Sequence, residues 1–189
     1  MLTLIIGCMY SGKSTEVLRQ IRLARSLHHA VFSISFAGDT RYGEAGSVRT
    51  HDGDSETCCV AVSRLLPLLN NSQLRAAKLV VVDEAHFFPD LHMFVLGCVD
   101  ELGKAICVAG LDADSKAEPF ENIMSLLPFA DEVLRLRGMC RACGDGTPAT
   151  LSLRLSDTHG ERLLVGGQDT YMPVCRRHFL SDEPPNPQQ

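Results

Sequence analysis

The sequence predicts an α/β protein: a parallel sheet covered by helices over residues 1–137, then a small second domain over residues 138–180. Two observations favour the sheet. Short apolar runs alternate with helical patterns, and a glycine-rich loop directly follows the first run. A third observation marks the second domain, because helical spacing stops near Gly138 and short β-like runs replace it, at Ala149–Leu155 and Arg162–Val165. Residues 181–189 are proline-rich and are predicted to be a disordered tail.

The elements of the first domain follow from the apolar pattern. After the first run, apolar residues at helical spacing predict a helix that reaches Leu27. A second helix is expected from the predicted N-cap Asp90 to Gly103. Residues 37–56 are polar and without periodicity, so a long loop is expected there. Strands are expected at Leu2–Ile6, Ala30–Ser35, Leu79–Val82, Ala105–Ala109 and Val133–Leu136.

The loop after the first strand has the spacing of a phosphate-binding P-loop. Residues 7–14 match Gly-x-x-x-x-Gly-Lys-Ser, with a strand-like run before them and a helical pattern after them. The backbone N–H groups of such a loop surround the β- and γ-phosphates, with Lys13 as a mobile cation and Ser14 as a ligand of Mg²⁺. The first domain is therefore predicted to bind a nucleotide.

Two adjacent carboxylates follow the third strand. Asp83 fits the Walker-B role of holding Mg²⁺ or its water shell, whereas Glu84 is suited to accept a proton from an attacking hydroxyl or to orient a water. The sequence Asp-Glu-Ala-His also occurs in helicases, but a helicase of that type needs two motor domains, more than 189 residues can contain. We therefore favour a kinase over a nucleic-acid motor.

Two pairs of metal-ligand residues predict a zinc site in the second domain. Cys140 and Cys143 form the first pair, and Cys175 and His178 form the second. Three thiolates and an imidazole suit tetrahedral Zn²⁺, and so small a segment needs such a staple to fold. Because the protein fills all four positions, the predicted zinc is structural.

The composition argues against a membrane-spanning or a secreted protein. No apolar stretch reaches the roughly 18 residues of a membrane span, and the first residues run into a predicted strand, which leaves no room for a signal peptide. We expect a cytoplasmic protein whose eight cysteines are reduced. Its net charge is −5, and a mild basic excess over residues 135–178 is interpreted as a solvated surface. Neither a membrane nor a nucleic acid is expected as a partner.

Together the motifs resemble the zinc-containing, tetrameric type of thymidine kinase, and the resemblance covers nearly the whole chain. It implies ATP-dependent phosphorylation of the 5′-hydroxyl of deoxythymidine to dTMP in nucleoside salvage, with Mg²⁺ and structural Zn²⁺ as cofactors. It also implies a homotetramer and feedback inhibition by dTTP. The matching segments are Gly7–Thr15, Asp39–Arg41, Asp83–Asp90, Gly110–Asp112, Glu118–Phe120, Cys140 with Cys143, Gly166–Tyr171, and Cys175 with His178.

The resemblance also implies a role for each matching residue, with Glu84 as the general base and Arg162–Gly166 as the start of the lasso that reads the base edge. The implied ATP contacts are Gly7, Cys8, Met9, Tyr10, Ser11, Gly12, Lys13, Ser14, Asp39, Thr40, Arg41, Asp83, Glu84, Ala85 and His86. The implied nucleoside contacts are Met9, Phe87, Leu111, Phe120, Thr150, Arg162, Leu163, Leu164, Val165, Gly166 and Tyr171.

The chain departs from the family pattern at two positions. Ser115 stands where relatives usually carry an aromatic residue, so one wall of the nucleoside pocket is expected to be missing. Cys8 stands where proline is common, which makes the loop less rigid but removes no phosphate-binding group. Three alternatives stay open: a P-loop kinase for another nucleoside such as deoxycytidine or deoxyuridine, a zinc-ribbon nucleic-acid-binding ATPase, and a regulatory nucleotide-binding module.

Overall fold

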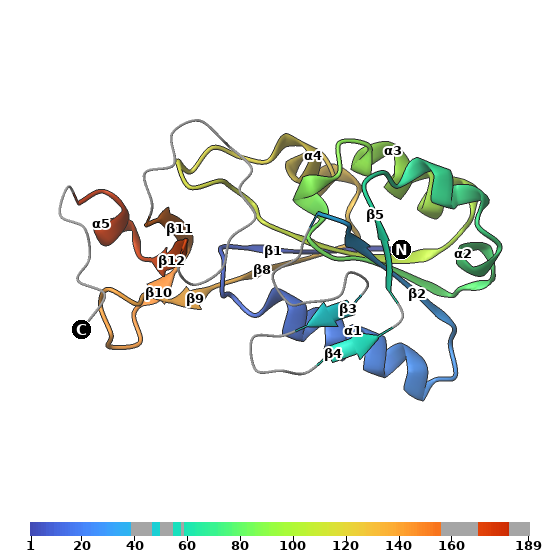
Figure 1. The fold of residues 1–189 in the computed structure, drawn as a ribbon, viewed down its shortest axis with the longest axis horizontal. Helices are drawn as coiled ribbons and strands as arrows, with labels where there is room; N and C mark the ends of the chain where they lie inside the picture. The colour runs from blue at the N-terminus through green and yellow to red at the C-terminus, as the bar shows by residue number, and fades with distance from the viewer. Residues whose placement is uncertain (39–46, 50–54, 58, 156–169, 182–189) are drawn as a thin grey trace.

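A six-stranded sheet forms the centre of the protein, whose computed structural model describes residues 1–38, 47–49, 55–57, 59–155 and 170–181 (Figure 1). The strand order is β5-β2-β6-β7-β1-β8, and every neighbouring pair is parallel. The α/β prediction is thereby confirmed. The strands are β1 (Leu2–Gly7), β2 (Val31–Phe36), β5 (Cys59–Val62), β6 (Leu79–Val82), β7 (Ala105–Gly110) and β8 (Glu132–Leu136).

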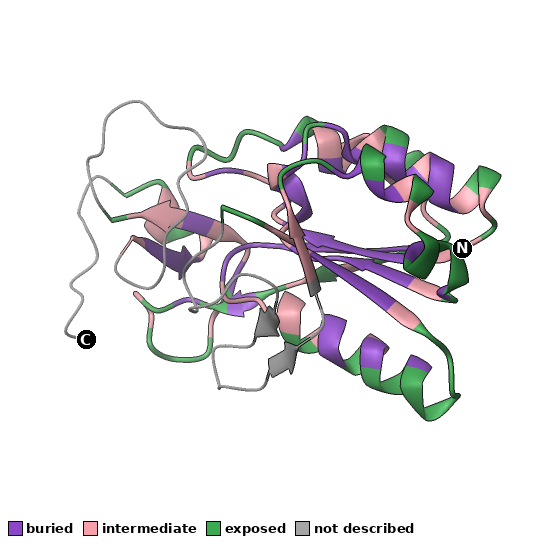
Figure 2. Ribbon diagram, turned by 45° about the vertical axis from the view of Figure 1, so that its right-hand side comes forward, coloured by how far each residue is buried: buried purple, intermediate pink, exposed green. Residues whose placement is uncertain are grey.

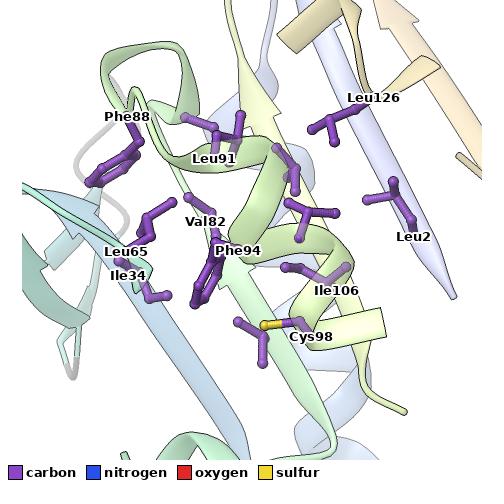
Figure 3. Close-up of a cluster of buried hydrophobic side chains, with 14 of the residues drawn as sticks. Leu2, Ile34, Leu65, Val82, Phe88, Leu91, Phe94, Cys98, Ile106 and Leu126 are labelled. Atoms are coloured by element: carbon purple, nitrogen blue, oxygen red, sulfur yellow. The ribbon is translucent and has the colours of Figure 1, made fainter. Parts of the chain in front are cut away.

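Helices cover both faces of this sheet (Figures 1 and 2). Helix α1 (Lys13–Ser26) packs on one face, where its apolar side chains meet Ile5 and Val81. Helix α3 (Leu91–Leu96) lies on the other face, where Phe94 packs against the strand side chains shown in Figure 3. The same face carries η1 (Leu66–Asn70), α2 (Ser72–Ala76), η3 (Gly97–Glu101), α4 (Glu121–Met124) and η4 (Leu127–Phe129).

Successive side chains along each strand point alternately into these two cores, because a β-strand is pleated. Leu4 and Ile6 belong to the core under α3, whereas Ile5 belongs to the core under α1, and all three are at most 3% exposed. Since both faces are covered, the central strands β1, β6 and β7 are mostly apolar, which is why their runs stand out in the sequence. The parallel arrangement also places the carboxyl ends of β1, β6 and β7 at one edge of the sheet.

The structure corrects the prediction for the helix after Asp90. The α-helix ends at Leu96, and a π-helical turn over Gly97–Glu101 replaces its second half. Asp90 stands at the N-cap position, but its Oδ2 accepts from the backbone N–H groups of Leu65 at 2.9 Å and Leu66 at 3.0 Å rather than capping the helix. The Asp90 carboxylate therefore connects the start of η1 to the start of α3.

Three other features of the first domain go beyond the prediction. Helix α1 ends at Ser26 with Leu27 as its C-cap, and Leu27 is 58% exposed. Strand β5 was not predicted, although Cys59–Val62 is an apolar run as long as the predicted strand β6. The predicted loop over residues 37–56 includes an antiparallel pair of short strands, β3 (Ser47–Arg49) and β4 (Ser55–Thr57).

The C-terminal unit, residues 138–155 and 170–181, lies beyond the carboxyl end of β1 (Figure 1). Its two antiparallel pairs confirm the β-like run predicted at Ala149–Leu155. The run predicted at Arg162–Val165 and the tail after Ser181 lie outside the described residues. The elements are β9 (Gly138–Met139), β10 (Pro148–Ala149), β11 (Leu151–Arg154), β12 (Tyr171–Val174) and α5 (Arg176–Phe179). None of the helices in the described ranges has both the length and the hydrophobicity needed to span a membrane.

Candidate functional site

The glycine-rich loop (Gly7–Ser14) connects the carboxyl end of β1 to the start of α1. Gly7 and Gly12 have φ angles of 150° and 87°, conformations that residues with a Cβ rarely adopt. A Cβ at Gly7 would also collide with the carbonyl oxygen of Leu136 on the neighbouring strand β8. Both glycines are thus required by the tight path of the loop, and helix α1 begins at Lys13, directly after Gly12.

Lys13 folds back over this loop. Its Nζ donates hydrogen bonds to the carbonyl oxygens of Cys8 at 2.7 Å and Gly7 at 3.3 Å. Burial lowers the pKa of Lys13 from its ordinary value, while the negative charges of Glu84 and Asp83 act in the opposite direction. The ammonium group therefore lies within electrostatic reach of both carboxylates.

Asp83 and Glu84 leave the sheet where β6 ends. The backbone N–H of Asp83 donates to the carbonyl of Ile34 at 3.0 Å, so Asp83 is held against β2, and its buried Oδ1 accepts from the N–H of Glu84 at 2.9 Å. Glu84 has φ 49° and ψ 40°, which is uncommon for a residue other than glycine and typical of functional sites. The Glu84 side chain keeps 21% of its surface exposed, so its carboxylate remains accessible to a substrate.

Aromatic side chains converge beside Glu84 around His86, the buried central residue of η2 (Ala85–Phe87). The His86 ring lies 4.2 Å from the Phe87 ring and 5.0 Å from the Phe120 ring, measured between centroids. Its Nδ1 is 3.6 Å from Glu84 Oε2 and accepts from the N–H of Leu111 at 3.4 Å. Three predicted nucleoside contacts are thereby brought together around His86: Phe87 in η2, Leu111 after β7 and Phe120 before α4.

Sequence reasoning missed several groups that build this site. Phe36, at the end of β2, stacks on Phe87 with centroids 4.8 Å apart and rings inclined by 13°. Asn122 donates from Nδ2 to the carbonyl oxygens of His86 and Phe88, each at 3.0 Å. Phe88 itself is fully buried in the core under α3. The one available signal was that Phe36 directly follows the predicted strand Ala30–Ser35, at the carboxyl edge of the sheet.

The C-terminal unit contacts the glycine-rich loop directly. The backbone N–H of Met9 donates to Ser152 Oγ at 3.0 Å, and Cys8 Sγ donates to the carbonyl oxygen of Ala149 at 3.4 Å. Thr150 is half-buried between β10 and β11, and Tyr171 is buried in β12. Of the predicted nucleoside contacts, Met9 lies in the glycine-rich loop, whereas Thr150 and Tyr171 lie in the C-terminal unit. The two hydrogen bonds therefore join the segments that carry these three residues.

The remaining predicted positions fall into two groups. Asp39, Thr40, Arg41 and the segment Arg162–Gly166 lie outside the described residues. Ser115 is half-buried in a turn in which Asp114 Oδ1 accepts from the N–H groups of Lys116 at 2.9 Å and Glu118 at 3.0 Å. Close to this turn, Arg135 Nε forms an ion pair with the buried Asp112 at 3.0 Å.

The predicted metal ligands Cys140, Cys143, Cys175 and His178 come together, with their ligand atoms all within 4.8 Å of one another. The Sγ atoms of Cys143 and Cys175 are 3.8 Å apart, and His178 Nδ1 is 3.4–3.5 Å from all three sulfurs. A tetrahedral centre with Zn–S bonds of about 2.3 Å separates its sulfurs by about 3.8 Å. The donor set and the spacing therefore fit zinc.

Local backbone structure supports a thiolate at this cluster. The backbone N–H of His178, at the start of α5, lowers the pKa of the Cys175 thiol to about 6. Cys175 is then ionised near neutral pH, which is the form that binds a metal. By contrast, burial raises the pKa of Cys107, inside the sheet, to about 12, so this cysteine stays a neutral core side chain.

Comparison with known proteins agrees with this geometry. A family model described as thymidine kinase matches residues 1–179. Thymidine kinase a of Arabidopsis thaliana is 39% identical over 181 residues, which cover 94% of this chain and 74% of the relative. The thymidine kinase of Oryza sativa is 37% identical over 95% of this chain and 66% of the relative. The monkeypox virus thymidine kinase is 34% identical over 94% of this chain and 95% of the relative. This chain therefore belongs to the thymidine kinase family and is an enzyme, a kinase.

Proposed function

We propose that this chain transfers the γ-phosphate of ATP to the 5′-hydroxyl of deoxythymidine, giving dTMP and ADP. The observation that carries the proposal is the convergence of three features at the carboxyl edge of the sheet: the glycine-rich loop with Lys13, the partly exposed carboxylate of Glu84, and the aromatic cluster around His86. In a chain of the thymidine kinase family, these features would serve as a phosphate cradle, a base and an apolar wall for the nucleoside.

The phosphate half of the site would consist of residues 7–14 with Asp39, Thr40, Arg41 and Asp83. Backbone N–H groups of the loop and the Lys13 ammonium would bind the β- and γ-phosphates. The Ser14 hydroxyl and the Asp83 carboxylate are oxygen donors of the kind that Mg²⁺ prefers, so they would hold this ion, which neutralises phosphate charge when bound. The segment Asp83–His86 would line the side of ATP that faces the nucleoside.

The nucleoside half would use stacking and directed hydrogen bonds, because deoxythymidine carries no charge. Phe87, Phe120, Leu111 and Met9 would wall the pyrimidine, and Tyr171 would close over the nucleoside. Thr150 would lie near the thymine methyl group. Backbone groups of Arg162, Leu163, Leu164, Val165 and Gly166 would read the base edge.

Glu84 would act as the general base. As the 5′-oxygen attacks the γ-phosphorus, the new O–P bond forms while the bond to the β-γ bridging oxygen breaks, and the hydroxyl proton passes to the Glu84 carboxylate. Most of the rate acceleration would come from alignment of the two substrates and from stabilisation of charge on the transferred group. Lys13, whose pKa is lowered by burial and raised in part by the negative charge of Glu84, would act beside this base on the phosphate side.

We further propose that the Cys140, Cys143, Cys175 and His178 cluster holds a structural zinc, and that the chain divides into domains at residues 137 and 138. The spacing of the four ligand atoms supports the zinc. A cytoplasmic homotetramer inhibited by dTTP would follow the pattern implied by the family resemblance. Such an inhibitor would occupy the nucleoside and phosphate subsites together.

The proposed function is tested by phosphoryl transfer from MgATP to a panel of nucleosides. We expect dTMP as the main product, with deoxyuridine as a poorer acceptor because it lacks the methyl group near Thr150. A preference for deoxycytidine would indicate a kinase for another nucleoside. ATP hydrolysis that depends on DNA, with no nucleoside phosphorylated, would instead indicate a nucleic-acid-binding ATPase. Tight ATP binding without transfer to any acceptor would indicate a regulatory module.

Substitution Ser115→Phe tests the incomplete wall of the nucleoside pocket. We expect the added ring to change KM for deoxythymidine more than kcat, because stacking on a ground-state base contributes equally to substrate and transition state. Steady-state kinetics with varied deoxythymidine measures both constants. Ser115→Ala is the matched control and should leave KM unchanged. Equal losses in kcat and kcat/KM in the phenylalanine variant would contradict the placement of Ser115 beside the base.

A further inference from the structure

The peptide unit between Cys8 and Met9 is held on both sides. Its N–H, from Met9, donates to Ser152 Oγ at 3.0 Å, and its carbonyl oxygen, from Cys8, accepts from Lys13 Nζ at 2.7 Å. The N–H and C=O of a trans peptide point in opposite directions across one plane, and the described chain contains no cis peptide. The two hydrogen bonds therefore fix the orientation of this plane between Ser152 and Lys13.

The Ser152 side of this arrangement is buried. Ser152 is 4% exposed and Met9 is 7% exposed, so water cannot easily replace the hydroxyl as acceptor for the Met9 N–H. Cys8 is 1% exposed, and its side chain packs with Ala149, Met172 and Val174 of the C-terminal unit. The first half of the glycine-rich loop thus rests on the C-terminal unit, while Lys13 rests on the loop.

We propose that Ser152 is a positioning residue that orients the glycine-rich loop and, through the Cys8 carbonyl, sets the position of the Lys13 ammonium for phosphate binding. This inference rests on the proposed function of the loop. Without the Ser152 hydroxyl, the buried Met9 N–H must turn toward another acceptor, and the Cys8 carbonyl turns with it. Lys13 then loses its docking point, and the later N–H groups of the loop no longer converge on the phosphates.

Two variants of equal shape isolate the hydroxyl. Ser152→Thr keeps it, whereas Ser152→Val replaces it with a methyl group, so any effect of the extra bulk is common to both. We expect Ser152→Val to weaken MgADP binding about tenfold relative to Ser152→Thr, the loss expected for one buried hydrogen bond. Isothermal titration calorimetry without nucleoside measures the dissociation constants. In steady-state assays, KM for ATP should rise while kcat changes less.

A matched control separates positioning from loss of stability. Thr3, at the far end of β1 from the loop, is 5% exposed and donates from Oγ1 to Glu132 Oε2 at 3.4 Å. Thr3→Val should lower the melting temperature, as Ser152→Val does, yet leave the MgADP dissociation constant unchanged. If Ser152→Val does not fold, Ser152→Ala against the native protein gives the same comparison.

The outcomes distinguish the inference from the proposed function. If the native protein does not bind MgADP, the proposed function itself fails. If the native protein binds MgADP and the hydroxyl-free variants bind it equally well, only the role of Ser152 is overturned. Weaker binding in both Ser152→Val and Thr3→Val by the same factor would also overturn it, because general destabilisation would then account for the loss.

Discussion

Glu84→Gln is expected to lower kcat by a factor of about 10²–10⁴, the contribution typical of a general base. Glutamine has the shape of glutamate but cannot accept the hydroxyl proton at neutral pH. The hydrogen bond from the residue 84 backbone N–H to Asp83 Oδ1 is retained in this variant, so the left-handed turn should persist. Steady-state kinetics should therefore show a large loss in kcat with small changes in KM for ATP and deoxythymidine.

Glu101→Gln is the matched control, because Glu101 is exposed at the end of η3 and belongs to no part of the proposed site. It should retain native kcat. If Glu84→Gln keeps kcat within a factor of about three, the assignment of the base is wrong. If it instead loses nucleotide affinity with kcat unchanged, Glu84 serves the phosphate subsite and another group must take the proton.

Loss of the metal is expected to unfold the C-terminal unit. Its apolar cluster of buried residues is small, and structural zinc sites in domains of this size supply about 10 kcal/mol or more of apparent binding free energy at neutral pH. Cys143→Ser should therefore lose stoichiometric zinc and expose the unit to proteolysis. Because Cys8 and Met9 bond to Ala149 and Ser152, nucleotide affinity should fall as well.

Elemental analysis and limited proteolysis measure these two effects on the purified protein. Cys107→Ala is the control, since Cys107 lies in the sheet core and outside the metal cluster. It should lose some stability while keeping one zinc per chain. A Cys143→Ser protein that retained stoichiometric zinc and resisted proteolysis like the native chain would show that the cluster does not bind the metal.

The sequence predicted most of the fold because local patterns decide it. Strands buried on both faces give continuous apolar runs, and the first run is punctuated by a glycine-rich motif. Two features depended on longer-range structure. Strand β5 lies at the edge of the sheet and is defined by its pairing with β2. The change from α-helix to π-helix at Gly97 gives no change in apolar spacing, because the same face stays buried through Cys98.

The candidate site likewise contains features that the local sequence predicted and contacts that it did not. Spacing alone predicted the glycine-rich loop, the pair Asp83 and Glu84, and the metal ligands, because each is a short motif with its own chemistry. The bond from Met9 to Ser152 joins residues 143 positions apart, and no local signal marks either partner. The stacking of Phe36 on Phe87 likewise depends on which strands are neighbours. Contacts that orient the motifs were therefore visible only in the structure.

The central claim is that Glu84 meets the nucleoside hydroxyl beside the glycine-rich loop. A crystal structure with deoxythymidine and a non-hydrolysable MgATP analogue tests it most directly. We expect a Glu84 carboxylate oxygen about 2.6–3.2 Å from the 5′-oxygen of the nucleoside, with the γ-phosphate on the opposite side of that oxygen. A nucleoside bound elsewhere, or a Glu84 carboxylate directed away from the 5′-oxygen, would contradict the mechanism.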